Sequence, residues 1–473
     1  MSDKSTIRTL LPFNGFDYNG CKNPTCDAFM RPPLSGLLKW SRECNYKISG
    51  SGRDKSIRCK ECGNYSVLKS NKGIWEEFIR QSAYLRLTHT YCPNQNCPNH
   101  ELSVERYPKG YRNKGRQRSG NNKYQCKHCK SYITTTELTH LRERKYSHVE
   151  RGLFWDLCND SSFRRIIGRH NITPLVLYDK IDFIHQQCLR FVALREVKMQ
   201  HKLPKQLYVA MDKQDYVVNW SDHKKKKNVQ LTAVCSVETQ TGYCLGMHLN
   251  FCSDIGASDV YARALSNGDS DGVPCMRQYA QYYLPNDLSS YAAGNDGKLP
   301  FYAQLPTSGS QLHSEYTVGG HSLLVRHLLG DDKEIVFSLD GDSMLAIYVF
   351  AAFSREIKNG QCHVLNASFD KHMIMDDRKR LYNQSRKLLR LFAEKNGLLD
   401  LKEAERLMVK DIVQQMLCER GGLYKAKFKH PVDKVNEPTR VITALSPLDE
   451  HLDIDKLTEI YNTASIERLD TYF

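Results

Sequence analysis

The chain has 473 residues, and its 68 Lys and Arg residues outnumber its 53 Asp and Glu residues to give a formal net charge of +15. This length predicts two to four domains, and the excess of positive charge favours a polyanionic partner, first of all nucleic acid. No run of 18 apolar residues and no N-terminal apolar signal segment is present, so we expect a cytoplasmic protein without membrane contact.

Two copies of one cysteine pattern occupy the N-terminal region. In each copy a C-x4-C pair is followed by a C-x2-C pair, and CKNPTC…RCKEC is matched by CPNQNC…QCKHC. Four thiolates that converge from two tight turns are the ligand set of structural zinc, whereas buried small apolar cysteines would repeat both spacings only by chance. We therefore expect zinc ribbons at residues 1–75 and 76–150, with Cys44, His100 and His128 as lower-ranked ligands. The expected Zn2+ ligands are Cys21, Cys26, Cys59 and Cys62, then Cys92, Cys97, Cys126 and Cys129.

A basic segment, KGYRNKGRQRSGNNKY, separates the cysteine pairs of the second copy at residues 109–124. It has no acidic residue, as is typical of a loop that follows a phosphate backbone. A merely solvated basic loop is the alternative. The DNA contacts expected here are Arg112, Lys114, Arg116 and Arg118.

Residues 151–203 are expected to form an all-α helix-turn-helix. In SSFRRIIGRHNITPLVLYDKIDFI, apolar residues at helical spacing flank a turn at His170 and Asn171, and Pro174 begins the second helix. The second helix of such a motif lies in the major groove of DNA, although an ordinary helical hairpin has the same pattern. The expected contacts are Arg164, Arg165 and Arg169 to phosphates, and Thr173, Tyr178 and Lys180 on or beside the second helix.

The C-terminal half begins with a predicted three-stranded meander. Strands are expected over residues 207–219, 229–237 and 243–251, from their β-branched residues and the turn residues between them. Asp212 follows the apolar run YVAM in the first strand. The turn after that strand is basic, and its expected DNA contacts are Lys224, Lys225, Lys226 and Lys227.

Strands that alternate with helices follow the meander. The apolar strand EIVFSLD ends in Asp340, and a helical stretch, SMLAIYVFAAFSREI, leads to a further strand at residues 362–369. Residues 253–333 are turn-rich and give no clear element, and residues 374–440 include a long segment with helical periodicity. We expect both to be insertions in one domain that spans residues 204–473.

This order, with one acid in the first strand and another at the end of the fourth, resembles the ribonuclease-H-like core of DDE transposases. The segment NTASIERLDTYF, with Glu467 on an expected terminal helix, resembles the Asn-x4-Glu region that carries the last acid in bacterial insertion-sequence enzymes. Ribbons, a helix-turn-helix and such a core are the modular order of these transposases. The resemblance implies a multidomain fold: two small zinc ribbons, an all-α helix-turn-helix and an α/β ribonuclease-H-like core with a helical insertion.

The resemblance also implies an activity, which is metal-dependent strand cleavage and strand transfer on DNA. The three carboxylates would hold two Mg2+ or Mn2+ ions about 4 Å apart. Asp212 would bridge both ions, Asp340 would hold the ion near the nucleophile, and Glu467 would hold the other. The partner would be double-stranded DNA at the terminal repeats of the element, bound by a homo-oligomer in the bacterial nucleoid.

The residues leave alternatives open at each acid and for the function. Asp215 competes with Asp212, Asp342 competes with Asp340, and the rivals of Glu467 are Glu394, Glu403 and Glu405. A non-catalytic DNA-binding regulator or a domesticated transposase would keep the ribbons and the helix-turn-helix. A zinc-stabilised RNA-processing nuclease would share the acids without needing the helix-turn-helix.

Overall fold

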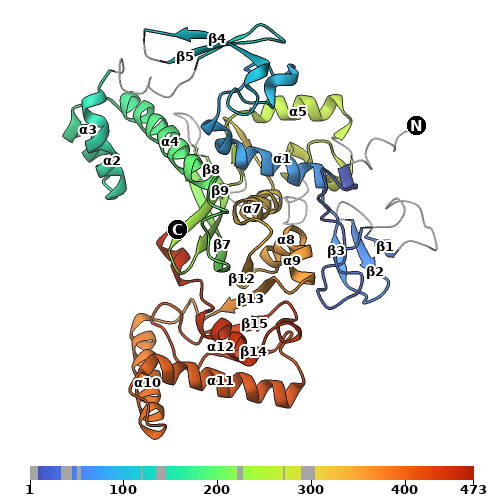
Figure 1. Cartoon of the computed structure of the whole chain (residues 1–473), viewed down its shortest axis with the longest axis vertical. Coiled ribbons are helices and arrows are strands. Elements are labelled where there is room, and N and C mark those ends of the chain that lie inside the picture. Colours follow the sequence, from blue (N-terminus) through green and yellow to red (C-terminus); the bar gives the residue numbers. More distant parts are fainter. Residues whose placement is uncertain are drawn as a thin grey trace. The chain divides into compact units, whose positions relative to one another are not determined.

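The computed structural model describes residues 9–32, 45–50, 55–118, 121–134, 145–220, 227–269, 272–288 and 304–472. The chain forms two compact units, Met1–Gln81 with Leu203–Phe473 and Ser82–Lys202. We call the first the α/β unit and the second the ribbon-helix unit (Figure 1). The expected boundary between residues 75 and 76 falls inside a helix, α1 (Asn71–Ser82). The first cysteine copy therefore belongs with the C-terminal half of the chain.

A mixed sheet, seven-stranded over the described residues, forms the centre of the α/β unit in the order β14-β15-β13-β12-β7-β8-β9. Its strands are β7 (Gln206–Asn219), β8 (Asn228–Glu238), β9 (Tyr243–Leu249), β12 (Glu334–Leu339), β13 (Cys362–Ser368), β14 (Lys427–Lys429) and β15 (Val441–Ala444). Strands β7, β8 and β9 are the expected antiparallel meander. Strands β12 and β13 run parallel to β7, and β15 and β14 extend the sheet antiparallel to β13.

Helices cover both faces of this sheet because its strands are apolar on both sides. On one face, Tyr208 and Val336 pack in a cluster with α11 (Leu401–Arg420) and α12 (Ile454–Thr463). On the other face, the ring of Phe337 packs against that of Phe353 at 5.0 Å between centroids. The helices on this side are α7 (Ser314–Leu329), α8 (Ser343–Ala352) and α9 (Ser354–Lys358).

The turn-rich region 253–333 contains a core helix that the sequence pattern did not reveal. Helix α7 buries 12 of its 16 residues and packs against β8, β9 and α8. Because polar residues such as Thr317, His321 and Ser322 are buried together with the apolar ones, the helix has no amphipathic period and its sequence gives no clear helical signal. Smaller elements in the region are α5 (Ala257–Ser266), η7 (Pro274–Met276) and β11 (Ser310–Gln311), which pairs with β10 (Phe251–Cys252) just before it. Neither α7 nor any other described helix is long and apolar enough to span a membrane.

The expected helical insertion is only partly helical. It contains α10 (Met375–Lys395) and α11, which are joined by a short turn. Its last part contains β14, and the chain then returns through β15 to the main sheet. The last elements are η8 (Leu448–Glu450), α12 and a short 3-10 helix, η9 (Glu467–Thr471).

The first cysteine copy forms a small antiparallel sheet of β1 (Tyr46–Ser49), β2 (Ser56–Cys59) and β3 (Tyr65–Val67). Aromatic contacts fix it within the α/β unit: Tyr18 lies 4.9 Å from Tyr348 and Phe29 lies 5.9 Å from Phe350, measured between ring centroids. Cys275 shares an apolar cluster with this ribbon. The first ribbon is therefore part of a continuous core.

The ribbon-helix unit holds the second cysteine copy and a group of helices. The ribbon strands are β4 (Tyr111–Arg116), β5 (Asn122–Cys126) and β6 (Tyr132–Thr134). The helices are α2 (Glu150–Cys158), α3 (Phe163–His170) and α4 (Pro174–Glu196), with the 3-10 turns η2 (Ala83–Thr88), η3 (Pro98–His100), η4 (Pro108–Gly110) and η5 (Ser147–Val149). As expected, Thr173 caps α4 by accepting a hydrogen bond from the backbone amide of Val176 (3.3 Å).

Candidate metal centres and acidic site

Both sets of four expected cysteines converge, with the sulfurs of each set within 4.8 Å of one another. Between the first and fourth cysteines the sulfurs lie 3.4 Å apart in the first cluster and 3.3 Å apart in the second. Between the second and third cysteines the distances are 3.9 Å and 3.7 Å. Four sulfurs about 2.3 Å from a tetrahedral zinc ion lie about 3.8 Å apart. Both clusters could therefore hold a zinc ion.

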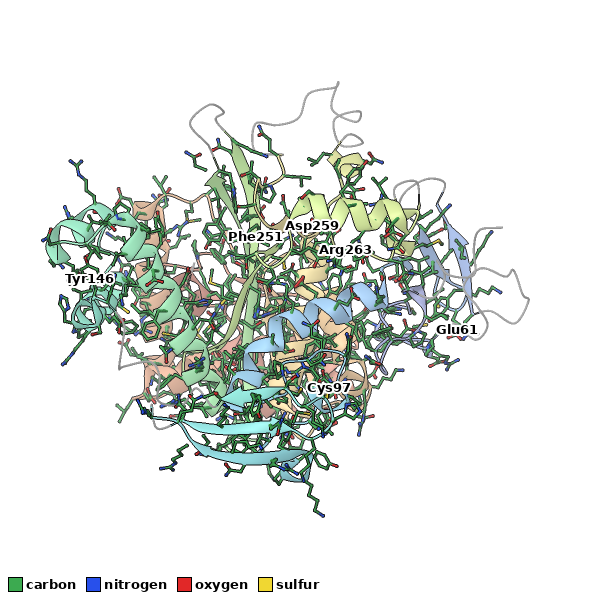
Figure 2. The ribbon with its side chains drawn as sticks, turned by 90° about the horizontal axis from the view of Figure 1, so that it is seen from above. Glu61, Cys97, Tyr146, Phe251, Asp259 and Arg263 are labelled. Atoms are coloured by element: carbon green, nitrogen blue, oxygen red, sulfur yellow. The ribbon has the colours of Figure 1, made fainter. Side chains whose placement is uncertain are left out.

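The two ribbons repeat each other in detail. Tyr46 pairs with Cys59 in the first ladder, and Tyr111 pairs with Cys126 in the second. Each tyrosine hydroxyl donates to the carbonyl five residues after the second cysteine of its copy, at 2.6 Å and 2.5 Å. The same buried tyrosine thus ties the two halves of each cluster together. In Figure 2, Glu61 labels the C-x2-C turn of the first copy and Cys97 the C-x4-C turn of the second.

The two lower-ranked ligands that the structure describes, His100 and His128, lie outside the four-cysteine clusters. A ring nitrogen of His100 lies 2.8 Å from the carbonyl oxygen of Cys92. A ring nitrogen of His128 lies 3.6 Å from the sulfur of Cys97, beside a cluster that already has four thiols. Cys44 lies outside the described residues. Each cluster is thus a closed set of four cysteines, which is the pattern of a structural site rather than a catalytic one.

The strand β4 and the two residues after it carry the basic residues expected to contact DNA. The side chains of Arg112, Lys114, Arg116 and Arg118 are all exposed. The strand bulges between Asn113 and Arg116, where Gly115 has a φ of 85°. No acidic residue occurs from 106 to 134, so this stretch of the chain has no negative side chain next to the positive row. Such a row matches the charge of a phosphate backbone.

Most of the expected contacts on α3 and α4 are also at the surface. The exposed residues are Arg164, Arg165, Arg169, Thr173 and Tyr178. Tyr178 packs edge to face against Phe163, with 5.8 Å between ring centroids, which joins the start of α4 to α3. Arg169 forms an ion pair with Asp156 of α2. The first turns of α4 are thus exposed, although exposed side chains also occur further along the helix.

Lys180 is a correction to the expected DNA contacts. It is 1% exposed, and its Nζ lies 2.6 Å from Oε1 of Glu150 on α2. It follows the buried Leu177 by three residues, so it lies on the inward face of α4. The prediction that Lys180 contacts DNA is wrong, because its charge is used inside the unit. Lys224, Lys225 and Lys226 lie outside the described residues, and the side chain of Lys227 is only half-exposed.

Asp212 and Asp340 lie side by side on the two central parallel strands. The β7 and β12 ladder pairs Met211 with Leu339, so the next residue of each strand is an aspartate on the same face. Burial, together with the charge of Asp340, raises the pKa of Asp212 to about 7. Two carboxylates that share one environment are typical of a cation site.

The rivals of these two acids have other partners. Asp215 lies on the opposite face of β7 and accepts a hydrogen bond from the hydroxyl of Thr232 at 2.6 Å. Asp342 caps α8 by accepting from the backbone amide of Met344 at 2.8 Å. It also forms an ion pair with Lys213 at 2.6 Å. Asp212, with Asp340 next to it, lines an open cavity.

That cavity has a volume of about 510 Å3. It is lined by Asp212, Lys213, Gln214, Phe369, Lys371, Arg378, Asn436 and Ile466. Three of these residues are cationic, and Lys371 contacts the acid pair directly, with its Nζ 2.5 Å from Oδ2 of Asp340. The mixture of carboxylates and cations suits a bound cation and a bound anion at one site.

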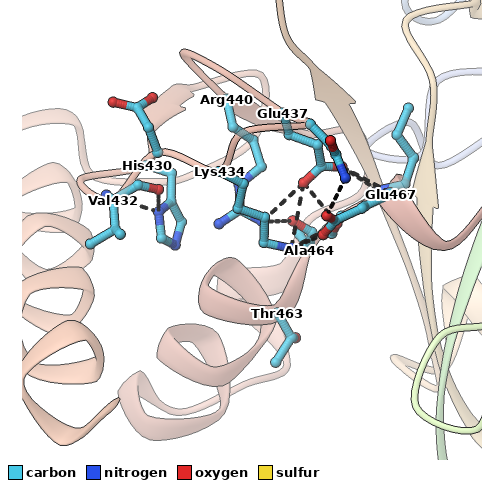
Figure 3. Close-up of polar contacts among 12 residues, drawn as sticks. His430, Val432, Lys434, Glu437, Arg440, Thr463, Ala464 and Glu467 are labelled. Carbon is cyan, nitrogen blue, oxygen red and sulfur yellow. Dashed lines mark hydrogen bonds and ion pairs between the residues drawn. The ribbon is translucent and has the colours of Figure 1, made fainter. Parts of the chain in front are cut away.

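Glu467 lies at the first position of η9, directly after Ile466, which lines the cavity. Figure 3 shows its side chain beside those of Lys434 and Glu437. Its carboxylate accepts hydrogen bonds from Nζ of Lys434 at 3.0 Å and from the side-chain amide of Asn436 at 2.9 Å. Burial by itself would raise the pKa of Glu467, but the charge of Lys434 and these hydrogen bonds lower it below its usual value. Asn436 also lines the cavity of Asp212, which connects the third acid to the pair.

Glu437 is a site residue that the sequence reasoning missed. Its side chain is fully buried and accepts hydrogen bonds from the backbone amides of Ile466 (2.7 Å) and Glu467 (3.0 Å). It also accepts from the hydroxyl of Ser465 at 2.7 Å and pairs with Arg440 at 3.5 Å (Figure 3). This carboxylate therefore fixes the start of η9. The only sequence signal was a charged loop, KVNEPTR.

The other candidates for the third acid do not line the cavity. Glu394 on α10 and Glu403 on α11 are exposed. Glu405 is half-buried, and its carboxylate lies 3.9 Å from Nε2 of His430. Burial raises the pKa of Glu405. Glu467 is thus the candidate whose own hydrogen-bond partner borders the site.

The three acids do not form a closed cage. Over the part of the chain that the structure describes, only the two cysteine clusters bring three or more potential ligand atoms within 4.8 Å of one another. Comparisons of the chain with protein-family models, with curated proteins and with solved structures find no match. Mg2+ is usually bound by one or two carboxylates, with water and substrate phosphates as its other ligands. Asp212 and Asp340 fit that requirement.

Proposed function

We propose that the protein is a DDE-type DNA transposase, which binds the ends of a mobile element and catalyses strand cleavage and strand transfer. The observation that carries the proposal is the proximity of Asp212, in the middle of β7, to Asp340, which directly follows β12. The run of strands β9-β8-β7-β12-β13, an antiparallel meander followed by two parallel strands, supports a ribonuclease-H-like core. Fold alone would not identify a function, so the acids carry more weight than the topology.

For this reaction the protein would mainly bind and position the metal ion and the DNA. A bound Mg2+ or Mn2+ would activate the attacking oxygen and stabilise the leaving oxygen of the phosphodiester. Asp212 and Asp340 would hold it, and Glu467 would act as the third acid from η9. The cationic residues of the cavity would bind the negative substrate, and the half-buried setting strengthens each of these interactions.

The ribbon-helix unit supports duplex DNA as the substrate. The exposed basic row of β4 suits a phosphate backbone, and the capped, exposed start of α4 suits a recognition helix in a helix-turn-helix. Zinc in the two clusters would be structural, because each has four thiol ligands and no open position. An RNA nuclease would have no use for such a helix.

The test is strand cleavage and joining of duplexes that carry the sequences flanking the coding region, in Mg2+ or Mn2+. We expect Asp212→Ala and Asp340→Ala to abolish both reactions while DNA binding is retained. Asp215→Ala is the matched control, because it removes a carboxylate from the same strand but from the opposite face. Binding without cleavage by the natural chain would instead indicate a non-catalytic DNA-binding protein. Preferential cleavage of RNA would indicate a nuclease.

A further inference from the structure

The ammonium group of Lys371 lies on the acid pair. Its Nζ is 2.5 Å from Oδ2 of Asp340, and its charge lowers the pKa of Asp212 against the effect of burial. One cation thus acts on both carboxylates. The side chain of Lys371 is nevertheless 54% exposed, so its ammonium is open to the cavity and is not locked in the core.

A rigid turn after β13 directs this side chain. The guanidinium of Arg378 donates to the backbone carbonyls of Lys371 and Met373, both at 2.8 Å. The carboxylate of Asp370 accepts from the backbone amide of His372 at 2.9 Å. The backbone of Lys371 is therefore held in place, while its four-carbon stem is long enough for the ammonium to move within the cavity.

The neighbouring lysines of the site have other partners. Lys213 pairs with Asp342 at 2.6 Å, and Lys434 pairs with Glu467 at 3.0 Å. Lys371 is the one that occupies an oxygen of the acid pair itself. An ammonium and a divalent cation repel each other and cannot both bind that oxygen, so they must compete for it. The displaced ammonium would remain beside a cavity that also contains Arg378.

We propose that Lys371 is a substrate-binding residue that exchanges partners: its ammonium neutralises Asp340 when no divalent cation is bound, and it binds a phosphate oxygen of DNA when a cation takes Asp340. The inference rests on the proposed function, because it assigns the negative substrate of the same site. A lysine suits this exchange, since it binds phosphate as a mobile point charge rather than through a fixed fork.

The proposal predicts effects of opposite sign from one substitution. In Lys371→Met, Mn2+ has no competitor at Asp340, so we expect its affinity in the absence of DNA to rise at least about threefold. The same variant lacks a charged contact to phosphate, so the gain in duplex affinity on adding Mn2+ should fall about tenfold. Single-turnover cleavage at saturating Mn2+ should fall in parallel. Lys371→Arg keeps the positive charge, so its Mn2+ affinity and its gain in duplex affinity should lie between those of the natural chain and those of Lys371→Met.

The experiment uses the zinc-loaded full chain. Free Mn2+ is measured by electron paramagnetic resonance, duplex affinity by fluorescence anisotropy with and without Mn2+, and cleavage in a single turnover. Lys379→Met is the matched control, because it removes one exposed lysine from the same region but not from the cavity. It should change neither Mn2+ affinity nor the Mn2+-dependent gain in duplex affinity.

Each outcome decides a part of the proposal. Unchanged or weaker Mn2+ binding by Lys371→Met would overturn the competition at Asp340. Tighter Mn2+ binding with an undiminished gain in duplex affinity would reduce Lys371 to a counterion and overturn the phosphate contact. If the natural chain binds Mn2+ and DNA but cleaves nothing, the proposed catalytic function fails. The two binding measurements then still decide the role of Lys371.

Discussion

The backbone amide of Asp340 donates a hydrogen bond to the carbonyl of Met211 at 3.3 Å. The bond extends the parallel β7 and β12 ladder one residue beyond the last residue of β12. Asp340 is thereby held next to Asp212, on the same face of the sheet. The site keeps two carboxylates together at a cost in stability, since burial and the charge of Asp340 both disfavour the charged form of Asp212.

Substitution of Asp212 by Asn should therefore stabilise the protein while it removes activity. The pKa of Asp212 is about 7, so at pH 8 its carboxylate is largely charged, half-buried and next to Asp340. Without added divalent cation, we expect the unfolding temperature of Asp212→Asn at pH 8 to rise by about 2–4 °C. Scanning calorimetry checks this. The control Asp215→Asn only weakens hydrogen bonds on the exposed face, so it should not raise the unfolding temperature. A lower unfolding temperature for Asp212→Asn would contradict the expected repulsion between Asp212 and Asp340.

Loss of zinc should affect the two ribbons differently. We expect Cys59→Ser and Cys126→Ser each to halve the zinc content measured by atomic absorption, because each removes one ligand of a four-thiol cluster. Cys59→Ser should lower the unfolding temperature of the α/β unit, since its ribbon shares a cluster with Cys275. Cys126→Ser should leave that transition unchanged and weaken DNA binding. Equal effects of both variants on the α/β transition would contradict this division.

The basic row of β4 should be visible in the salt dependence of DNA binding. Each phosphate contact contributes a slope of about 0.9 to the dependence of log affinity on log salt. The triple variant Arg112→Gln, Lys114→Gln, Arg116→Gln should therefore reduce the slope by up to about 3, which salt titrations by anisotropy measure. Lys47→Gln is the control, because Lys47 holds the position in the first ribbon that Arg112 holds in the second. A full-sized decrease in Lys47→Gln alone would point to net charge rather than to this row.

Substitutions of Lys180 and Arg165 should have different effects, because Lys180 stabilises the fold whereas Arg165 is expected to contact DNA. Lys180→Met leaves Glu150 without its buried partner and should destabilise the ribbon-helix unit by about 1–3 kcal/mol without changing the salt slope of DNA binding. Arg165→Gln removes an exposed charge and should do the reverse, reducing the slope by about 1 with little effect on stability. Chemical unfolding and salt titration measure the two effects. A smaller salt slope of DNA binding in Lys180→Met would show that Lys180 contacts DNA after all.

Local chemistry was predictable from the sequence, and long-range packing was not. The four-cysteine clusters follow from spacing alone, because tight turns fix where the thiols lie. Asp212 and Asp340 could be located because each follows an apolar strand run. The buried helix α7 was missed because its polar and apolar residues are buried alike, which leaves no amphipathic period. Strands β14 and β15 are too short to show an alternating pattern, and they exist because β13 offers an edge.

Buried charged residues could not be predicted from the sequence either. Lys180 carries the same charge whether it faces DNA or Glu150, and the partner is 30 positions away in the sequence. Glu437 looked like a loop acid but fixes the backbone of η9. When only the sequence is known, charged residues are expected at the surface, because burying an unpaired charge costs free energy. The exceptions are the residues whose partners come from another element.

The buried His321 gives a prediction for pH. It is fully buried on α7, with its Nε2 2.7 Å from the hydroxyl of Ser236 and its Nδ1 2.8 Å from Nδ1 of His248. Burial lowers the pKa of His321 to about 3, whereas an unfolded histidine has a pKa of about 6.5. Between these values the unfolded chain binds a proton that the folded chain does not. Stability therefore falls as pH falls through this window, by up to about 1.4 kcal/mol per pH unit, and the contribution vanishes above pH 6.5.

Replacement of His321 by Gln should remove this dependence. The amide can still pair with the hydroxyl of Ser236 but takes up no proton, so the loss of unfolding temperature between pH 7.5 and pH 5.5 should be smaller than in the natural chain. The cysteine clusters are common to both proteins, so their own pH response cancels in the comparison. His372→Gln, at an exposed position, should keep the natural slope. Equal slopes for His321→Gln and the natural chain would mean that His321 is protonated inside the fold, and the contact with His248 would then have to open at low pH.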